Sequence, residues 1–147
     1  MPDAGFKETE LFLLHEIVIR LDRLARATIL DPEGITYPEF LVLMAARELP
    51  SSTQDGVAEY LDMSKSLVSQ RVSSLMLKGL ALQQADPESR RKIKLVLTEA
   101  GSTKVEAIYA AMVHSTDELF ESLGSLRGAF RDALTGLAGG LAKAEGE

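Results

Sequence analysis

The fold is decided by the stretch LDMSKSLVSQRVSSLMLKGL, residues 61–80. Asp62-Met63 suits a tight turn, and Ser64 is a good N-cap for a helix that runs to about Leu77. Gly79 follows as the glycine expected just beyond a helix C-terminus. This stretch therefore predicts a turn followed by one well-delimited helix.

Two further helices are expected before this turn. The nearer one spans Ser52–Leu61, with Ser52-x-x-Asp55 as its capping box. The other begins at Thr36, which forms an S/T-x-x-E capping box with Glu39. The helix over residues 52–61 and the helix over residues 64–77 are short and are joined by a turn of a few residues, which predicts a helix-turn-helix.

The periodicity changes after the helix-turn-helix. Apolar and polar residues alternate over residues 92–97, which is typical of a strand, and Leu80 and Leu82 mark another strand. Residues 85–91 (ADPESRR) lie between them and are polar, turn-forming and basic at the end. Two strands with a charged hairpin tip form a wing, so the predicted fold class is mainly α (α+β), a winged helix-turn-helix with a two-stranded wing.

Long helices flank the winged region. One is expected over residues 9–30, one from Thr98 to about Asp117, and a last one from Glu118 to Ala144. The last helix has an apolar stripe and little local chain to cover it, which favours a subunit interface formed together with the first helix. Packing against its own chain is the alternative. The predicted regions are an N-terminal dimerisation helix (1–34), a DNA-binding lobe (35–98) and C-terminal dimerisation helices (99–147).

The composition is that of a globular protein. The 147 residues are 46% hydrophobic and 26% charged, which argues against disorder. The absence of cysteine excludes disulfides, thiolate metal sites, cysteine nucleophiles and cysteine-based redox sensing. Neither an apolar run of about 18 residues nor a secretory signal is found, so we expect a cytoplasmic protein without a membrane partner.

Charge is segregated along the chain. Residues 64–94 hold seven basic and two acidic residues, which gives this window a charge of +5 although the whole chain carries −6. The remainder therefore carries −11. Because phosphate binding depends on the local patch, the negative total does not exclude a nucleic-acid partner.

One face of the helix over residues 64–77 is suited to reading DNA bases. Projected at about 100° per residue, Val68, Val72 and Leu75 share the face that would anchor the helix to the core. Small hydroxyls and an amide fit a major groove, where Gln pairs with adenine and an apolar side chain meets the thymine methyl. The outer face consists of Ser66, Gln70, Ser73 and Ser74, with Leu67 at its edge. The basic residues expected to reach phosphates are Lys65, Arg71 and Lys78.

The wing supplies a second basic patch, made of Arg90, Arg91, Lys92 and Lys94. An arginine on a hairpin tip can enter a narrow minor groove, where the electrostatic potential is most negative. A solvated helix face and a solubilising loop are the alternatives for the two patches taken singly. A recognition helix followed at once by a basic hairpin favours double-stranded DNA as the partner.

Residues 53–101 resemble the MarR (multiple antibiotic resistance regulator) family. The resemblance is carried by VAEYLDMSKSLVSQRVSSLMLKGL (57–80) and by DPESRRKIKLVLTEAG (86–101), which is similar to the family's wing signature. It implies that Ser66, Ser69 and Gln70 lie on the groove-reading helix and that Arg91 is the wing arginine. It also implies a homodimer with entwined first and last helices, which represses transcription until a small phenolic or other lipophilic effector, or oxidation, releases it.

The chain departs from the family pattern at four positions. Ser89 stands where the family usually has an aspartate that orients the wing arginine, and Gln83 and Gln84 stand where arginine is common. Met76 replaces a usual glutamate. These differences bear on DNA affinity and wing geometry more than on the fold.

The effector site is predicted only as polar side chains for a pocket between the dimerisation helices and the DNA-binding lobe. These candidates are His15, Tyr37, Tyr60 and Tyr109. A surface or core position is the alternative for each of them. The two histidines do not form a metal-ligand set, and neither a metal nor a cofactor is expected.

Two other functions compete with that of a DNA-binding regulator. An enzyme is disfavoured because the sequence has no Gly-rich phosphate loop, nucleophile elbow or assignable acid–base pair. A winged-helix module that has lost DNA binding and serves protein contacts is consistent with Gln83, Gln84 and the acidic total. Salt-sensitive binding to duplex DNA distinguishes the regulator from this module.

Overall fold

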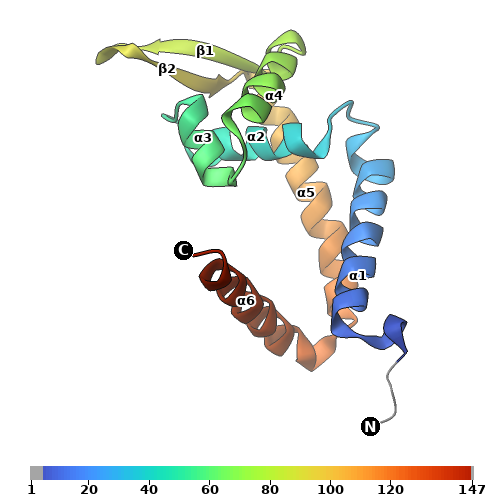
Figure 1. Cartoon of the computed structure of the whole chain (residues 1–147). Helices are drawn as coiled ribbons and strands as arrows, with labels where there is room; N and C mark the ends of the chain where they lie inside the picture. Colours follow the sequence, from blue (N-terminus) through green and yellow to red (C-terminus); the bar gives the residue numbers. More distant parts are fainter. Residues whose placement is uncertain (1–4, 147) are drawn as a thin grey trace. The chain divides into compact units, whose positions relative to one another are not determined.

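A computed structural model describes residues 5–146, with the side chain of Arg90 outside the described part. The chain forms two compact units, residues 1–110 and 111–147. The elements, in chain order, are α1 (Glu10–Ala25), a π-helical turn (Arg26–Leu30), α2 (Tyr37–Glu48), α3 (Gln54–Leu61), α4 (Lys65–Leu77), β1 (Ala81–Asp86), β2 (Ser89–Leu97), α5 (Glu99–Glu121) and α6 (Arg127–Ala144) (Figure 1). This architecture confirms the predicted, mainly helical winged helix-turn-helix class.

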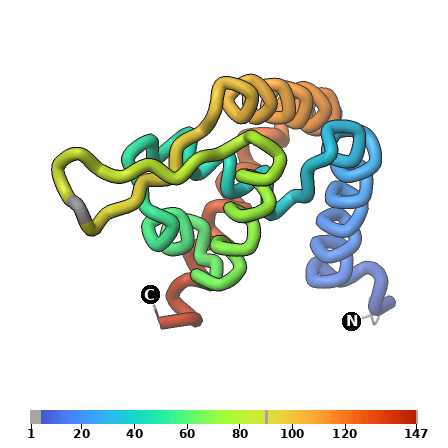
Figure 2. Tube along the Cα trace, turned by 90° about the horizontal axis from the view of Figure 1, so that it is seen from above, coloured from blue at the N-terminus to red at the C-terminus, as the bar shows by residue number. Residues whose placement is uncertain are grey.

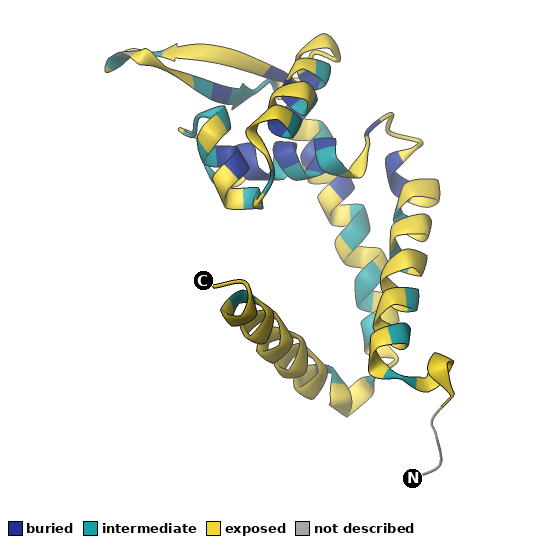
Figure 3. Ribbon diagram, viewed as in Figure 1, coloured by how far each residue is buried: buried dark blue, intermediate teal, exposed yellow. Residues whose placement is uncertain are grey.

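The core of the first unit lies where α2, α3 and α4 meet the base of the wing. Figure 3 shows the buried residues concentrated in these elements, whereas α1 is exposed along most of its length. Val68, Val72 and Leu75 are buried on one side of α4, as the helical projection predicts. Leu43 of α2 and Leu95 of β2 are buried in the same unit. Helix α4 is therefore seated on a packed core.

The helix starts follow the predicted capping chemistry, with one exception. The Thr36–Glu39 capping box is present at α2. At α3 the predicted Ser52–Asp55 box is wrong, since Thr53 is the N-cap and accepts a hydrogen bond from the Gly56 amide at 3.1 Å. Ser52 is instead drawn toward the sheet, where its carbonyl accepts a hydrogen bond from the Leu95 amide at 2.9 Å.

The wing is a longer and tighter hairpin than predicted. Strands β1 and β2 pair antiparallel, and the register shifts between Ala85 and Asp86. Only Pro87 and Glu88 remain outside the strands, so a turn over residues 85–91 is wrong. The hairpin extends beyond α3 and α4 (Figure 2). Arg91 and Lys92 consequently lie along β2 rather than at the tip of a loop.

The second unit contains the end of α5 and the helix α6. The predicted boundary at Glu118 is wrong, because α5 continues to Glu121. The chain then turns at Gly124, whose φ of 54° suits glycine, before α6 begins. Phe120 and Phe130 lie with their ring centroids 6.0 Å apart across this turn. No helix in residues 5–146 is long and apolar enough to cross a membrane.

Candidate nucleic-acid interface

Helix α4 presents a polar face to solvent. Ser66, Ser69, Gln70 and Ser73 are exposed, in agreement with the orientation expected from the sequence for three of them. Ser69, which the family resemblance places on this helix, is also exposed. Leu67, expected at the edge of this face, is half-buried. The outer face of α4 therefore offers short hydroxyls and one amide to a groove.

Ser74 is the exception on this helix, and its predicted outward orientation is wrong. Its side chain is half-buried, and its hydroxyl donates a hydrogen bond to Glu39 Oε1 at 2.6 Å. Lys78 is engaged at the same place, with Nζ 2.8 Å from Glu39 Oε2 and 2.9 Å from the Gly34 carbonyl oxygen. Both side chains satisfy a buried carboxylate of α2, and contact of Ser74 with DNA stays a prediction.

Glu39 is the buried acid that engages them. Its exposure is only 2%, and its Oε2 also accepts a hydrogen bond from the Thr36 amide at 3.0 Å. Burial by itself raises the pKa of this carboxyl, but the hydrogen bonds from Lys78, Ser74 and Thr36, with the charge of Lys78, lower it to about 2. Glu39 is therefore ionised at neutral pH and holds α2 against α4.

The low pKa of Glu39 predicts a loss of stability in acid. A carboxyl with a pKa of about 2 when folded and an ordinary value of 4.5 when unfolded stabilises the fold fully above about pH 4.5, and this contribution fades as the pH falls toward 2. Urea unfolding should therefore show that Glu39→Gln is less stable than wild type at pH 7, by at most about 3 kcal/mol. The difference should shrink below pH 4.5. A difference that stays constant down to pH 2.5 would contradict this account.

Arg71 has an unusual environment on the flank of α4. The side chain is half-buried, and its Nε is buried without a hydrogen-bond partner among the described residues. An unsatisfied buried N–H is costly, so an incoming oxygen acceptor would relieve it. Lys65, in contrast, is exposed and forms an ion pair with Asp55 at 3.2 Å, a contact that water screens strongly. Both cations remain able to meet phosphates.

The basic residues of the wing differ in their availability. Arg91 and Lys92 are exposed, and neither pairs with a carboxylate within the described part of the chain. Lys94 is half-buried, with Nζ 3.5 Å from Asp86 Oδ1. The Glu88 amide, followed by the charge of Lys94, lowers the pKa of Asp86 and keeps it ionised. Arg90, also predicted to contact DNA, has its side chain outside the described residues.

The four predicted effector residues are not brought together. His15, Tyr37, Tyr60 and Tyr109 are exposed on α1, α2, α3 and α5, and no hollow described on this structure is lined by two of them. Tyr109 lies under the guanidinium of Arg47, 5.3 Å from the ring centroid. Its ring therefore has a structural contact already.

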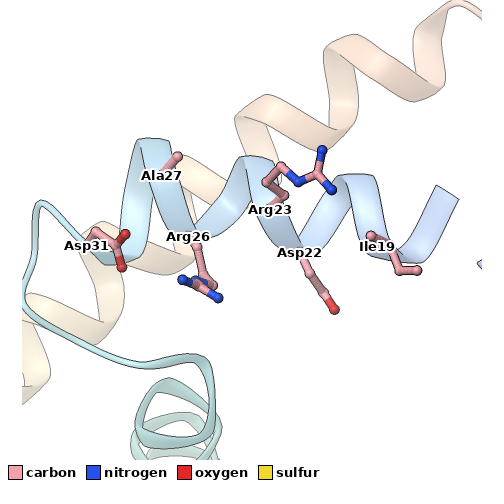
Figure 4. A pocket seen from close by; sticks show the side chains of 6 residues that line it. All are labelled: Ile19, Asp22, Arg23, Arg26, Ala27 and Asp31. Carbon is pink, nitrogen blue, oxygen red and sulfur yellow. The ribbon is translucent and has the colours of Figure 1, made fainter. Parts of the chain in front are cut away.

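Two shallow hollows lie along α1. His15 helps to line one of about 300 Å³. The other, of about 440 Å³, is lined by Ile19, Asp22, Arg23, Arg26, Ala27 and Asp31 (Figure 4). Arg23 borders both hollows. Sequence reasoning missed Arg23 and Arg26 because charges on an amphipathic helix indicate only a solvated face.

The arrangement of a buried helix-turn-helix core, an exposed polar face on α4 and a paired wing defines a winged helix-turn-helix protein. Residues 33–92 match the family model described as MarR family. This match agrees with the predicted resemblance over residues 53–92, the part common to both. No group of three or more His, Cys, Asp or Glu side chains that could hold a metal ion occurs in the described portion.

Solved structures agree over nearly the full chain. S. aureus MepR in a DNA complex has a TM-score of 0.80 and 21% identity, covering 93% of this chain and 99% of that one. CouR from Rhodococcus jostii RHA1, bound to p-coumaroyl-CoA, has a TM-score of 0.78 and 24% identity, with 92% and 95% covered. Bordetella bronchiseptica BpsR, whose DNA binding is regulated by 6-hydroxynicotinic acid, has a TM-score of 0.71 and 27% identity, with 97% of each chain covered. The sequence has no significant match among curated proteins.

Proposed function

We propose that this protein is a cytoplasmic, sequence-specific DNA-binding transcriptional regulator, and that it represses as a homodimer until an effector releases it. The observation that carries the proposal is the exposed face of α4, made of Ser66, Ser69, Gln70 and Ser73, together with exposed Arg91 and Lys92 on the adjoining wing. The similarity to MepR, solved in complex with DNA, supports the same conclusion.

Helix α4 would enter the major groove. Gln70 would read adenine through its amide, and the neighbouring serines keep the helix surface low enough to lie deep in the groove. Lys65 would exchange its exposed contact with Asp55 for a phosphate, and Arg71 would satisfy its buried Nε with a phosphate oxygen. In this arrangement Gln70 reads a base, whereas Lys65 and Arg71 hold the helix in register on the phosphates.

The wing would contact the adjacent minor groove. Arg91 is the side chain proposed to insert there, with Lys92 at the flanking phosphates. Arg90 remains a predicted contact of the same hairpin. With Ser89 in place of the family's aspartate, the Asp86–Lys94 pair is the ion pair that braces β1 against β2 near the tip.

A second copy of the chain would cover the apolar helices outside the lobe. Helix α6 buries none of its residues within the described chain, and Leu137 and Leu141 are 57% and 63% exposed. Helix α1 likewise exposes Leu11 and Leu14, at 65% and 42%. Such a stripe is costly in water unless it is covered. A twofold dimer would place two α4 helices in successive major grooves about 34–36 Å apart, so the operator would be pseudo-palindromic.

The effector is proposed to be a small lipophilic or phenolic compound. CouR binds p-coumaroyl-CoA, and 6-hydroxynicotinic acid regulates BpsR. Both compounds contain an aromatic ring. Ile19 and Arg23 line both hollows along α1, so an apolar side chain and a guanidinium are available there to an aromatic acid. The carboxylates of Asp22 and Asp31 in one hollow, and of Glu16 in the other, share the lining with them. His15 remains a candidate there, and Tyr37, Tyr60 and Tyr109 remain predictions.

Fluorescence anisotropy tests the proposed function directly. The pure protein would be titrated with duplex DNA from upstream of its own gene, and with a shuffled duplex, at about 50 and 200 mM salt. A regulator should prefer the native duplex, and its affinity should fall steeply with salt. Weak binding that is indifferent to sequence would instead favour a winged helix that serves protein contacts.

Replacing Arg91 with alanine should weaken DNA binding through the loss of one wing cation. We expect an affinity about tenfold lower and a salt slope reduced by about 1, because the side chain would release counterions from the minor groove. Lys143→Ala, which removes an equal charge at the end of α6, should leave both quantities unchanged. An unchanged slope for Arg91→Ala would remove the wing from the mechanism.

A further inference from the structure

The winged lobe contains a deeply buried acidic side chain, that of Glu39. Glu39 is 2% exposed in the first turn of α2, and two of its three hydrogen-bond donors are Ser74 of α4 and Lys78, the C-cap of that helix. A buried carboxylate needs all its partners, because removing one leaves an uncompensated charge in a region that water does not reach. The α2–α4 contact is thus tied to the side chains that serve Glu39.

The two α4 donors are placed to control the rotation of the helix about its axis. Ser74 and Lys78 are four residues apart and therefore lie one turn apart on the same side of α4. Their bonds to Glu39 are 2.6 and 2.8 Å long and are directional. The apolar contacts of the buried face are not directional.

A small rotation would also displace the residues proposed to face the bases, since Gln70 lies one turn before Ser74 on the same side of α4. Turning α4 by about 20° moves a side-chain tip 5–6 Å from the axis by about 2 Å. That displacement exceeds the tolerance of about 0.5 Å within which a binding group must be held. Gln70 and Ser73 would then lose their alignment with base edges even though the helix remained folded.

The loop before α2 is held from two sides. Lys78 donates to the Gly34 carbonyl as well as to Glu39. Lys104 of α5 donates to the carbonyl of Glu33 at 2.9 Å and to its carboxylate at 3.1 Å. The loop before α2 is therefore anchored to both α4 and α5 inside the first unit.

We propose that Glu39 is a positioning residue for sequence reading: its buried carboxylate, held by Ser74 and Lys78, sets the rotation of α4 and so the alignment of Gln70 with the bases. This inference rests on the proposed DNA-binding function. Glu39 itself does not contact DNA, and Lys78 acts here as its partner rather than as a phosphate contact.

Glu39→Gln is the informative variant. The glutamine side chain has the same size, but its NH₂ cannot accept the Ser74 hydrogen bond and its neutral amide removes the ion pair with Lys78. The bond from the Thr36 amide can be kept. Lys78→Met removes the other member of the ion pair. Asp55→Asn is the matched control, because it breaks an exposed α3–α4 ion pair whose side chains are 68% and 74% exposed.

The readout is the ratio of affinities for the native and shuffled duplexes. We expect Glu39→Gln and Lys78→Met each to lower this ratio by about 5-fold or more, the range that 1–2 kcal/mol produces. The salt slope should stay at the wild-type value in both variants. Partial unfolding would instead weaken binding to both duplexes equally and leave the ratio intact. Asp55→Asn should keep the wild-type ratio.

Hydrogen exchange separates failure of this inference from failure of the proposed function. In Glu39→Gln, amides in the second half of α4 should exchange faster, while those around Val105 and Ile108 in the buried start of α5 keep their protection. A wild-type protein without sequence preference would overturn the proposed function, and α4 exchange alone would then decide whether Glu39 positions the helix. A wild-type affinity ratio in Glu39→Gln, or unchanged α4 exchange, overturns the positioning role.

Discussion

Replacing Gly101 with alanine is expected to destabilise the winged lobe by about 2–5 kcal/mol, within the range of severe core substitutions. A Cβ at this position would lie 1.9 Å from the Leu80 carbonyl oxygen and 2.9 Å from its carbon. Neither atom can swing aside as a side chain could, because both belong to the backbone where β1 begins. The first turn of α5 and the base of the wing would have to separate.

The local hydrogen bonds raise the cost of that separation. The Thr98 hydroxyl donates to the Gly79 carbonyl at 2.7 Å and accepts from the Gly101 amide at 3.0 Å. The Thr98 amide donates to the same Leu80 carbonyl at 3.1 Å. Moving α5 away would weaken these bonds together and tilt the wing that carries Arg91.

Urea unfolding followed by circular dichroism measures this effect. Ser102→Ala, one residue further along α5 and exposed, is the control and should unfold at the wild-type urea concentration. Duplex affinity of Gly101→Ala should fall as well, because the wing and α4 would no longer be held in one geometry. A variant as stable as wild type would show that α5 and β1 can separate at little cost.

Replacing Leu137 with glutamate should convert the proposed homodimer into a monomer. Leu137 is 57% exposed on α6, so a charge there costs little within one chain but would be buried against the second copy. Sedimentation velocity should then report the mass of one 16.0 kDa chain. Affinity for the native duplex should fall by about 100-fold or more, because two linked half-site contacts become one.

Thr135→Glu is the control variant, which tests whether the effect depends on where in α6 the charge is placed. Thr135 lies two residues before Leu137 and therefore on the other side of α6. This variant should remain dimeric and bind DNA as wild type does. A dimeric Leu137→Glu protein would remove this face of α6 from the subunit interface.

Local signals in the sequence were sufficient for most of the fold. The Thr36–Glu39 box, the Ser64 cap and Gly79 each act within a few residues, so they predicted the starts of α2 and α4 and the end of α4 correctly. The periodicity of Val68, Val72 and Leu75 identified the buried side of α4 for the same reason. Ser66, Gln70 and Ser73 were correctly predicted to be exposed, because they lie on the side of α4 away from these apolar residues.

The errors occurred where a distant segment competes for a residue. Ser52 has the chemistry of an N-cap, but its carbonyl pairs with Leu95, more than forty positions further along the chain, and the cap passes to Thr53. Pairing between β1 and β2 likewise extended the strands into the expected turn and left only Pro87 and Glu88 outside. The Ser52–Leu95 hydrogen bond joins distant segments and leaves no trace in a local pattern, whereas the hairpin pairing overrides the turn signals directly beside it.

The sequence by itself determined the winged helix-turn-helix, its polar reading face and its basic hairpin, because capping, periodicity and turn chemistry act between near neighbours. Only the tertiary structure decided which polar side chains remain available to a partner. Glu39, Ser74 and Lys78 resemble solvated residues in the sequence, yet they meet across 35 to 39 positions and satisfy one another. Burial of a charge depends on what the fold brings against it, and that depends on contacts between distant segments.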